Sequence, residues 1–115
     1  MNQIHFSEQI VKMSVTAFKW MANDIYQVYI PSLKLSSYGP KNEAADEMMN
    51  FSLKEFVLDL EKVKNANVEF ALSNLGWNRD SSEEESFSHI SIDKEDVIQQ
   101  LELKNIELIE ETFSI

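Results

Sequence analysis

The chain of 115 residues contains no cysteine, which excludes thiol catalysis, a disulfide framework and zinc sites of the cysteine type. Its two glycines are too few for the glycine-rich loops that hold phosphates or dinucleotides. The two histidines, His5 and His89, have no helical His or Glu partner at metal-ligand spacing. We therefore expect no catalytic residue, no metal site and no cofactor.

Long apolar runs are also missing. No run approaches the roughly 18 residues that a membrane span requires. The N-terminal stretch MNQIHFSEQ has neither the basic nor the apolar segment of a signal peptide. The lack of cysteine suits a reducing compartment, so we expect a soluble cytoplasmic protein without membrane contact.

Basic residues are scarce, since 10 Lys and Arg face 20 Asp and Glu, for a net charge of −10. Residues 1–80 hold ten acids and eight bases, whereas residues 81–115 hold ten acids and only two bases. A surface of this kind repels nucleic acid, because phosphate binding depends on Lys and Arg. It attracts a basic protein partner instead.

Apolar residues are plentiful enough for one hydrophobic core. They make up 43% of the chain, and aromatic residues make up 10%. A chain of this length buries roughly two thirds of the surface that its unfolded form exposes. We expect residues 1–115 to form a single domain without help from disulfides or metals.

The first 40 residues show the alternating pattern of strands. Residues 9–20 place Val11, Met13, Val15 and Ala17 on one side, which is typical of a half-buried strand. Residues 25–30 are rich in β-branched and aromatic side chains, and residues 33–38 form a third short run. Asn and Asp at 23–24 favour a turn, so the pattern predicts a three-stranded antiparallel meander.

A helical period replaces the alternation after residue 41. Apolar residues then recur at three- and four-residue steps as far as Val63, which predicts an amphipathic helix of about six turns. A second, shorter helix is expected over residues 68–75, with Gly76 as a left-handed C-terminal cap. We expect the helices to cover one face of the sheet.

The last third begins with an acidic loop over residues 78–86, NRDSSEEES, which has no apolar residue. A strand over residues 87–92 follows, then a helix with Asp93 as its N-cap that ends near Leu103. A final strand is expected over residues 106–115. The predicted class is therefore α+β: the meander, the long helix, a short second helix and an acidic β-α-β segment over residues 87–115.

The stretch from Asp24 to Leu60, DIYQVYIPSLKLSSYGPKNEAADEMMNFSLKEFVLDL, resembles the core of the HicB family, the antitoxin half of bacterial HicA/HicB pairs. The family pattern is a strand ending at a proline turn, a short strand, a glycine, and a long helix that opens with acidic and alanine residues. Here Pro31, Gly39 and Glu43 occupy those places, and the HicB-like core would span residues 24–65.

The chain departs from the family in two places. Residues 33–38 replace a compact Pro-Gly-Cys element, and the C-terminal region is acidic where many members carry a basic DNA-binding segment. The resemblance implies a protein-binding domain that caps a small basic ribonuclease toxin, while the acidic C-terminal region predicts that this chain does not bind DNA. Its candidate contacts are aromatic residues of the meander and carboxylates of the last third: Tyr26, Tyr29, Tyr38, Glu83, Glu84, Glu85, Asp93, Glu95 and Asp96.

Other functions remain open on the sequence. An acidic decoy or immunity protein of phage origin, which imitates nucleic acid, would use the same carboxylates to bind a nucleic-acid enzyme. A homodimeric structural protein would pair the strand over residues 106–115 with its twofold mate. Paired carboxylates could also support acid-base catalysis, although no pair stands out. Met48, Met49, Phe51 and Phe56 lie at helical spacing and are either core residues or an adaptable partner surface.

Overall fold

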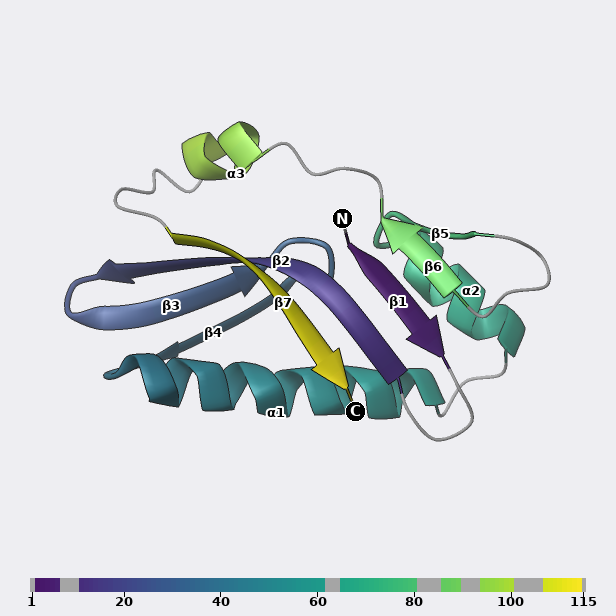
Figure 1. Ribbon diagram of the computed structural model, residues 1–115, viewed down its shortest axis with the longest axis horizontal. Coiled ribbons are helices and arrows are strands. Elements are labelled where there is room, and N and C mark those ends of the chain that lie inside the picture. The colour runs from purple at the N-terminus through teal and green to yellow at the C-terminus, as the bar shows by residue number, and fades with distance from the viewer. Residues whose placement is uncertain are drawn as a thin grey trace.

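The structure is a computed structural model that describes residues 2–6, 11–61, 65–80, 86–89, 94–100 and 107–114. It has the expected α+β class, with an antiparallel sheet and three helices in the described residues (Figure 1). The elements in chain order are β1 (Gln3–Phe6), β2 (Val11–Ala22), β3 (Ile25–Ile30), β4 (Leu35–Gly39), α1 (Asn42–Glu61), α2 (Asn65–Ser73), β5 (Trp77–Arg79), β6 (Ser86–His89), α3 (Lys94–Gln100) and β7 (Glu107–Ser114).

The sheet is organised around β2, its longest strand. β7 pairs antiparallel with residues 12–19 of β2. Met13 pairs with both β1 and β7, and Phe18 pairs with both β3 and β7. Because a strand residue has one neighbour on each side, β1 and β3 must lie end to end along the same edge of β2. β4 continues the sheet beyond β3, and β6 and β5 continue it beyond β1.

Asn2 fills the gap between β1 and β3 on that edge. Its Oδ1 accepts a hydrogen bond from the backbone N–H of Thr16 at 2.9 Å, and its Nδ2 lies 3.4 Å from Thr16 Oγ1. Asn2 is only 7% exposed, so the bond satisfies a backbone donor in a buried place. The Asn2 side chain thus takes the place of a backbone hydrogen bond between strands.

The Asn2→Ala substitution is expected to lower the free energy of unfolding by about 2 kcal/mol, because it leaves the buried Thr16 N–H without its acceptor. Thr16→Val is the matched control, since it removes the hydroxyl at the 3.4 Å contact and keeps the 2.9 Å bond from the backbone N–H to Asn2. Urea unfolding of both variants measures the difference. A larger loss in Thr16→Val than in Asn2→Ala would contradict this role for Asn2.

The turns of the meander confirm the predicted break points. Asn23 and Asp24 both have positive φ, 53° and 63°, as a two-residue type I′ hairpin requires. β3 ends at residue 30, where Pro31 opens a turn over residues 31–34. β4 therefore begins at Leu35, two residues later than the pattern predicted.

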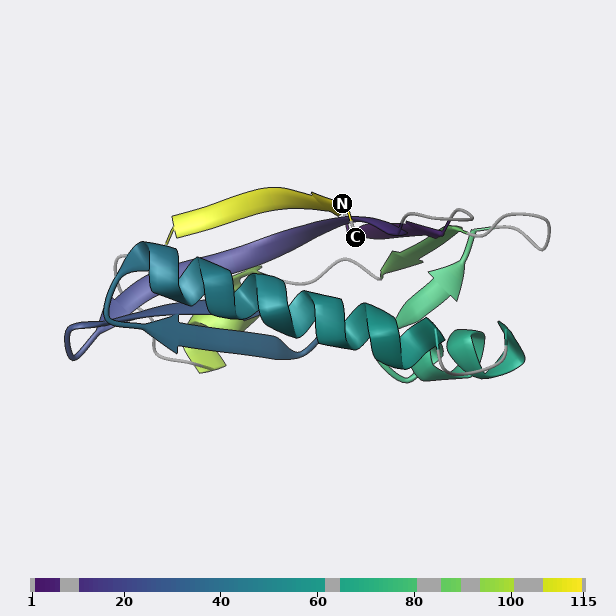
Figure 2. The same ribbon diagram turned by 90° about the horizontal axis from the view of Figure 1, so that it is seen from below.

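α1 covers one face of the β2–β4 half of the sheet. Figure 2 shows β4 along one side of α1, with β2 and β7 on the other side. The helix is continuous, and its buried positions recur at three- and four-residue steps: Ala45, Met49, Leu53, Val57 and Leu60. They pack on Val11, Met13, Val15, Ala17, Val28 and Ile30 of the sheet, as the two patterns predicted. Two details differ: Met48, expected on the same helix face, is 39% exposed, and the opposite face of β2 is buried at Thr16 and Phe18, so this strand is more than half-buried.

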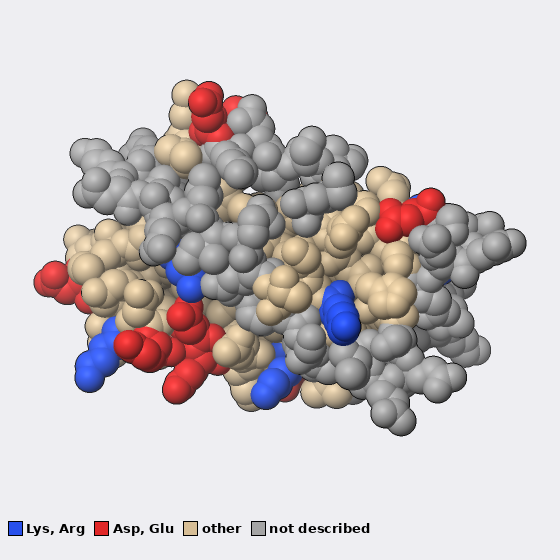
Figure 3. Space-filling view, viewed as in Figure 1, with Lys and Arg blue, Asp and Glu red and all other residues tan. Residues whose placement is uncertain are grey.

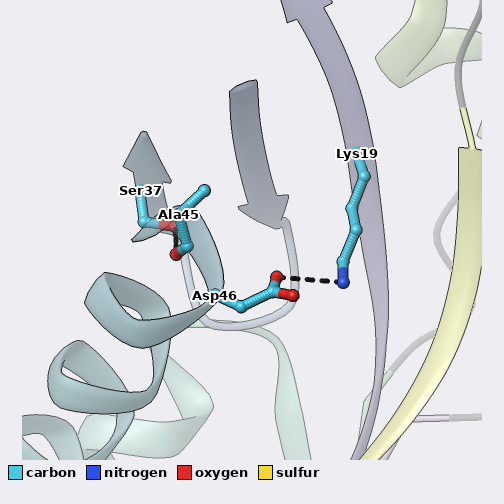
Figure 4. Close-up of polar contacts among 4 residues, drawn as sticks. All are labelled: Lys19, Ser37, Ala45 and Asp46. Atoms are coloured by element: carbon cyan, nitrogen blue, oxygen red, sulfur yellow. Dashed lines mark hydrogen bonds and ion pairs between the residues drawn. The ribbon is translucent and has the colours of Figure 1, made fainter. Parts of the chain in front are cut away.

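Three contacts hold the first turns of α1 against the sheet. Ser37 Oγ donates to the carbonyl oxygen of Ala45 at 2.8 Å, and Lys19 Nζ lies 3.0 Å from Asp46 Oδ1 (Figure 4). Gly39 comes close to the helix, because a Cβ there would lie 2.8 Å from the Cβ of Ala44. The helix therefore runs antiparallel to β4 at close range.

The other half of the sheet is tied to the meander by Trp77. This side chain is 1% exposed, and its Nε1 donates to the carbonyl oxygen of Ser32 at 2.8 Å. His89 packs edge-on against the Trp77 ring and lies 2.6 Å from the carbonyl oxygen of Leu75 through Nε2. Gly76, the predicted left-handed residue after α2, has a φ of 93°.

The structure corrects several predictions. β1 and β5 were not expected. Of the acidic loop predicted over residues 78–86, residues 78–79 belong to β5 and residue 86 to β6, and residues 81–85 lie outside the described part. The Arg79 guanidinium lies 4.9 Å from the centre of the Phe87 ring, a contact that the sequence pattern does not show. α3 lies on the side of the sheet opposite α1, so the helices do not share one face (Figures 1 and 2).

The strand, helix and final strand that were predicted for the last third of the chain appear in the predicted order. The predicted strand over residues 87–92 appears as β6, and its residues after 89 lie outside the described part. The helix appears as α3, while its proposed N-cap, Asp93, is also outside. The final strand is confirmed as β7. Of the helices described, none has the length and apolar content of a membrane span.

Candidate protein-binding surface

The outer face of α1 carries large apolar side chains. Met48, Phe51 and Leu58 are 39%, 65% and 48% exposed, although the helix buries a complete apolar stripe on its other side. Exposed apolar groups that gather on one element are typical of interaction sites. α1 therefore has a second apolar face that the core does not use.

α1 is also strongly acidic. Its sequence holds six carboxylates and a single lysine, Lys54, so the helix carries a net charge of −5. Figure 3 shows acidic atoms gathered at the lower left, over the N-terminal part of α1. The acidity of α1 is not evident from the near balance of charge over residues 1–80, because most of the basic residues of that region lie outside the helix.

A pocket of about 290 Å³ opens between this helix and the start of β4. We call it the α1–β4 pocket, and it is lined by Leu35, Phe51, Ser52, Glu55, Phe56 and Asp59. Leu35 and Phe56 are half-buried and pack against the core, so they form a fixed apolar floor. Phe51 and Glu55 are exposed.

The chemistry of the α1–β4 pocket suits a side chain of another protein. Its volume lies at the lower limit for small-molecule sites, which are usually 300 to 1,000 Å³. Two aromatic rings and two carboxylates favour a group with an aliphatic stem and a positive end. In the described part of the chain, no three His, Asp or Glu residues gather as metal ligands would.

The three tyrosines predicted as contacts do not form one surface. Tyr26 pairs with Gly39 and faces α1, where it is half-buried against the core. Tyr29 and Tyr38 belong to the opposite face of the sheet, since Tyr38 pairs with Gln27. Tyr38 is 61% exposed, whereas Tyr29 is half-buried.

The predicted acidic contacts are placed only in part. Glu83, Glu84, Glu85 and Asp93 lie outside the described residues. Glu95 and Asp96 are exposed in the first turn of α3, on the opposite side of the sheet from α1 (Figure 1). Of the predicted contact residues that the structure describes, none lines the α1–β4 pocket.

Sequence reasoning missed Leu35, Glu55 and Asp59, and it left the role of the aromatic residues of α1 open. The structure divides that set: Met49 is core, Phe56 is half-buried, and Met48 and Phe51 are exposed. One signal was available. Phe51 lies midway between two core positions of the helix, so its side chain must point away from the sheet.

A second polar cluster lies on the other half of the sheet. His5 Nδ1 is 2.6 Å from Ser86 Oγ across the β1–β6 pair, and Ser88 Oγ donates to Asp80 Oδ1 at 2.6 Å. A serine nucleophile also needs a group that orients the histidine and donors for an oxyanion. Neither kind of contact is seen for His5 and Ser86 in the described residues. Their contact links the paired strands β1 and β6.

Comparisons of the chain with protein-family models, with characterised proteins and with solved structures found no match. The resemblance of residues 24–60 to HicB proteins therefore stays a prediction from the sequence.

Proposed function

We propose that this domain is a non-enzymatic binding module that captures a basic protein partner on the outer face of α1. Its partner would be a small basic protein, such as a toxin of the kind that HicB-like antitoxins cap, in the cytoplasm. The proposal rests on one observation: the exposed Phe51 lines a pocket together with the carboxylates of Glu55 and Asp59.

Two properties of the surface support this proposal. Aromatic side chains on a rigid element are common anchors of protein interfaces, because they bury a large area at a small entropy cost. The helix that presents Phe51 is held by a full core stripe, so the surface is largely formed before binding. The net charge of −5 on α1 would draw a basic partner towards it and repel an acidic one.

The Phe51→Ala substitution is expected to weaken the complex at least tenfold and to change the free energy of unfolding by less than about 0.5 kcal/mol. The product of the adjacent gene is the first partner to test. Light scattering of the mixture shows whether a stoichiometric complex forms, and titration calorimetry gives its affinity.

Phe70→Ala is the matched control, because Phe70 is 68% exposed on α2 and does not line the pocket. The control should bind the partner as the parent protein does. A protein that only pairs with itself, or a complex weakened equally by both substitutions, would count against this surface. The homodimeric reading would then take precedence.

A further inference from the structure

Among the described residues, no strand pairs with the outer edge of β4. β4 is the last strand of the sheet on its side, and its five residues pair with β3 in an uninterrupted register. No other segment among the described residues pairs with β4, so half of its backbone groups face outwards. An edge of this kind is a template for an incoming strand.

The residues that usually block such an edge lie outside β4 itself. Proteins prevent unwanted strand addition with proline, lysine or a bulge within the edge strand. Here Lys34 precedes β4 and Pro40 follows it, while the strand between them, LSSYG, contains neither residue. These two positions limit an added strand to about the length of β4.

The α1–β4 pocket lies beside this edge. Ser37 bonds to α1 and Gly39 touches it, so the side chains of Leu35 and Ser37 point to the helix side of the strand. Leu35 and the flank of α1 that includes Ser52 and Phe56 line the pocket together. The side chains of an added strand alternate between faces, so every second one would lie against that flank.

The negative charge of the pocket favours basic side chains on the part of the added strand that faces α1. An arginine or lysine on the helix side could lay its aliphatic stem on Phe51 and Phe56 and bring its positive end to Glu55. On the other side of the added strand, apolar side chains would lie beside Tyr38, which is 61% exposed. A strand with alternating basic and apolar residues fits both faces.

We infer that the partner is bound by strand addition, with a basic, extended segment pairing to the outer edge of β4 and filling the α1–β4 pocket. Main-chain hydrogen bonds provide affinity in this mode, and the pocket provides specificity. The inference rests on the proposed function, because it names the element of the partner that α1 and β4 receive.

The test uses a blocked eight-residue peptide of alternating arginine and valine as the probe. Its affinity for the full chain is measured by calorimetry or fluorescence anisotropy at physiological salt. Two further peptides carry N-methyl groups on only the arginines or only the valines. Because alternate residues of a strand turn their N–H groups to the same edge, we expect one set of N-methyl groups to abolish binding and the other to be tolerated.

Variants of the protein locate the bound peptide. Phe51→Ala and Glu55→Gln should each weaken peptide binding at least fivefold, whereas Phe70→Ala and Glu47→Gln should not change it. Glu47 is an exposed acid of the same helix that does not line the pocket, so its variant matches the loss of charge. Equal loss in Glu47→Gln and Glu55→Gln would show attraction by net charge alone and overturn the inference.

The outcome also separates this inference from the proposed function. If Phe51→Ala weakens the complex with the protein partner while both N-methylated peptides bind like the parent peptide, strand addition is wrong and the binding surface stands. If neither the protein partner nor the peptide depends on Phe51, both fail. Self-association that depends on Phe51, without peptide binding, would assign the edge to a second copy of the chain and also overturn the inference.

Discussion

Trp77→Ala is expected to lower the free energy of unfolding by about 4 kcal/mol, in the range for a large aromatic residue lost from a core. The ring is 1% exposed, and its Nε1 bonds to Ser32, 45 positions away in the sequence. That bond joins β5 to the turn between β3 and β4. Its removal therefore weakens the connection between the two halves of the sheet, as well as leaving a cavity.

A graded series separates the hydrogen bond of Trp77 from its volume. Trp77→Phe keeps most of the packing and loses the bond to the Ser32 carbonyl, so we expect a loss of about 2 kcal/mol in urea unfolding. Ser32→Ala is the control. Its hydroxyl is buried without a hydrogen-bond partner among the described residues, so its removal should cost nothing or stabilise the protein slightly. A Trp77→Ala variant as stable as the parent would refute this account of the sheet.

Gly39→Ala is expected to lower the free energy of unfolding by about 2 to 3 kcal/mol, because a new methyl group is forced into a packed contact. The added Cβ would lie 2.8 Å from the Cβ of Ala44 and 2.9 Å from the backbone nitrogen of Ala45. Neither group is the end of a flexible side chain. β4 and the first turns of α1 must therefore move apart.

Two further variants test this reading of Gly39. Ala44→Gly in the Gly39→Ala background removes one of the two collisions and should recover part of the lost stability in urea unfolding. Ser36→Ala, at an exposed position on the opposite face of β4, should change stability by less than about 0.5 kcal/mol. Failure of Ala44→Gly to recover any stability would show that the cost arises elsewhere.

The meander and α1 could be predicted because their patterns are local and long. Val11, Met13, Val15 and Ala17 alternate on one side of β2, and the structure buries all four. Asn23 and Asp24 tolerate the positive φ that the hairpin needs. In these segments the side-chain period and the turn chemistry agree with the structure, except that Thr16 and Phe18 on the other face of β2 are buried as well.

β1 and β5 could not be predicted, because each is short and exists through partners far away in the sequence. β5 has three residues and pairs with β6, and β1 lies between β2 and β6. Asn2 and Trp77 gain their roles from bonds that span 14 and 45 positions. Contacts between residues so far apart leave no pattern in the local sequence.

The sequence predicted only part of the candidate surface. The acidic and aromatic character of the chain predicted a basic protein partner, but it directed attention to the tyrosines and the last third. The pairing of Tyr26 with Gly39 turns that tyrosine to the core side, whereas Tyr38 points to the other face. Phe51 and Leu35 line one pocket only because α1 runs back along β4.

The sequence by itself determined the class of this protein: an antiparallel meander with a long amphipathic helix, acidic and without cysteine. These features follow from composition and from side-chain periods of two and 3.6 residues, which act between near neighbours. The tertiary structure alone decided that β7 covers one edge of β2, that β1 and β3 share the other, and that no described strand pairs with the outer edge of β4 beside the α1–β4 pocket. Strand order depends on which distant segments pair, and the contacts that decide it form only when the chain has folded.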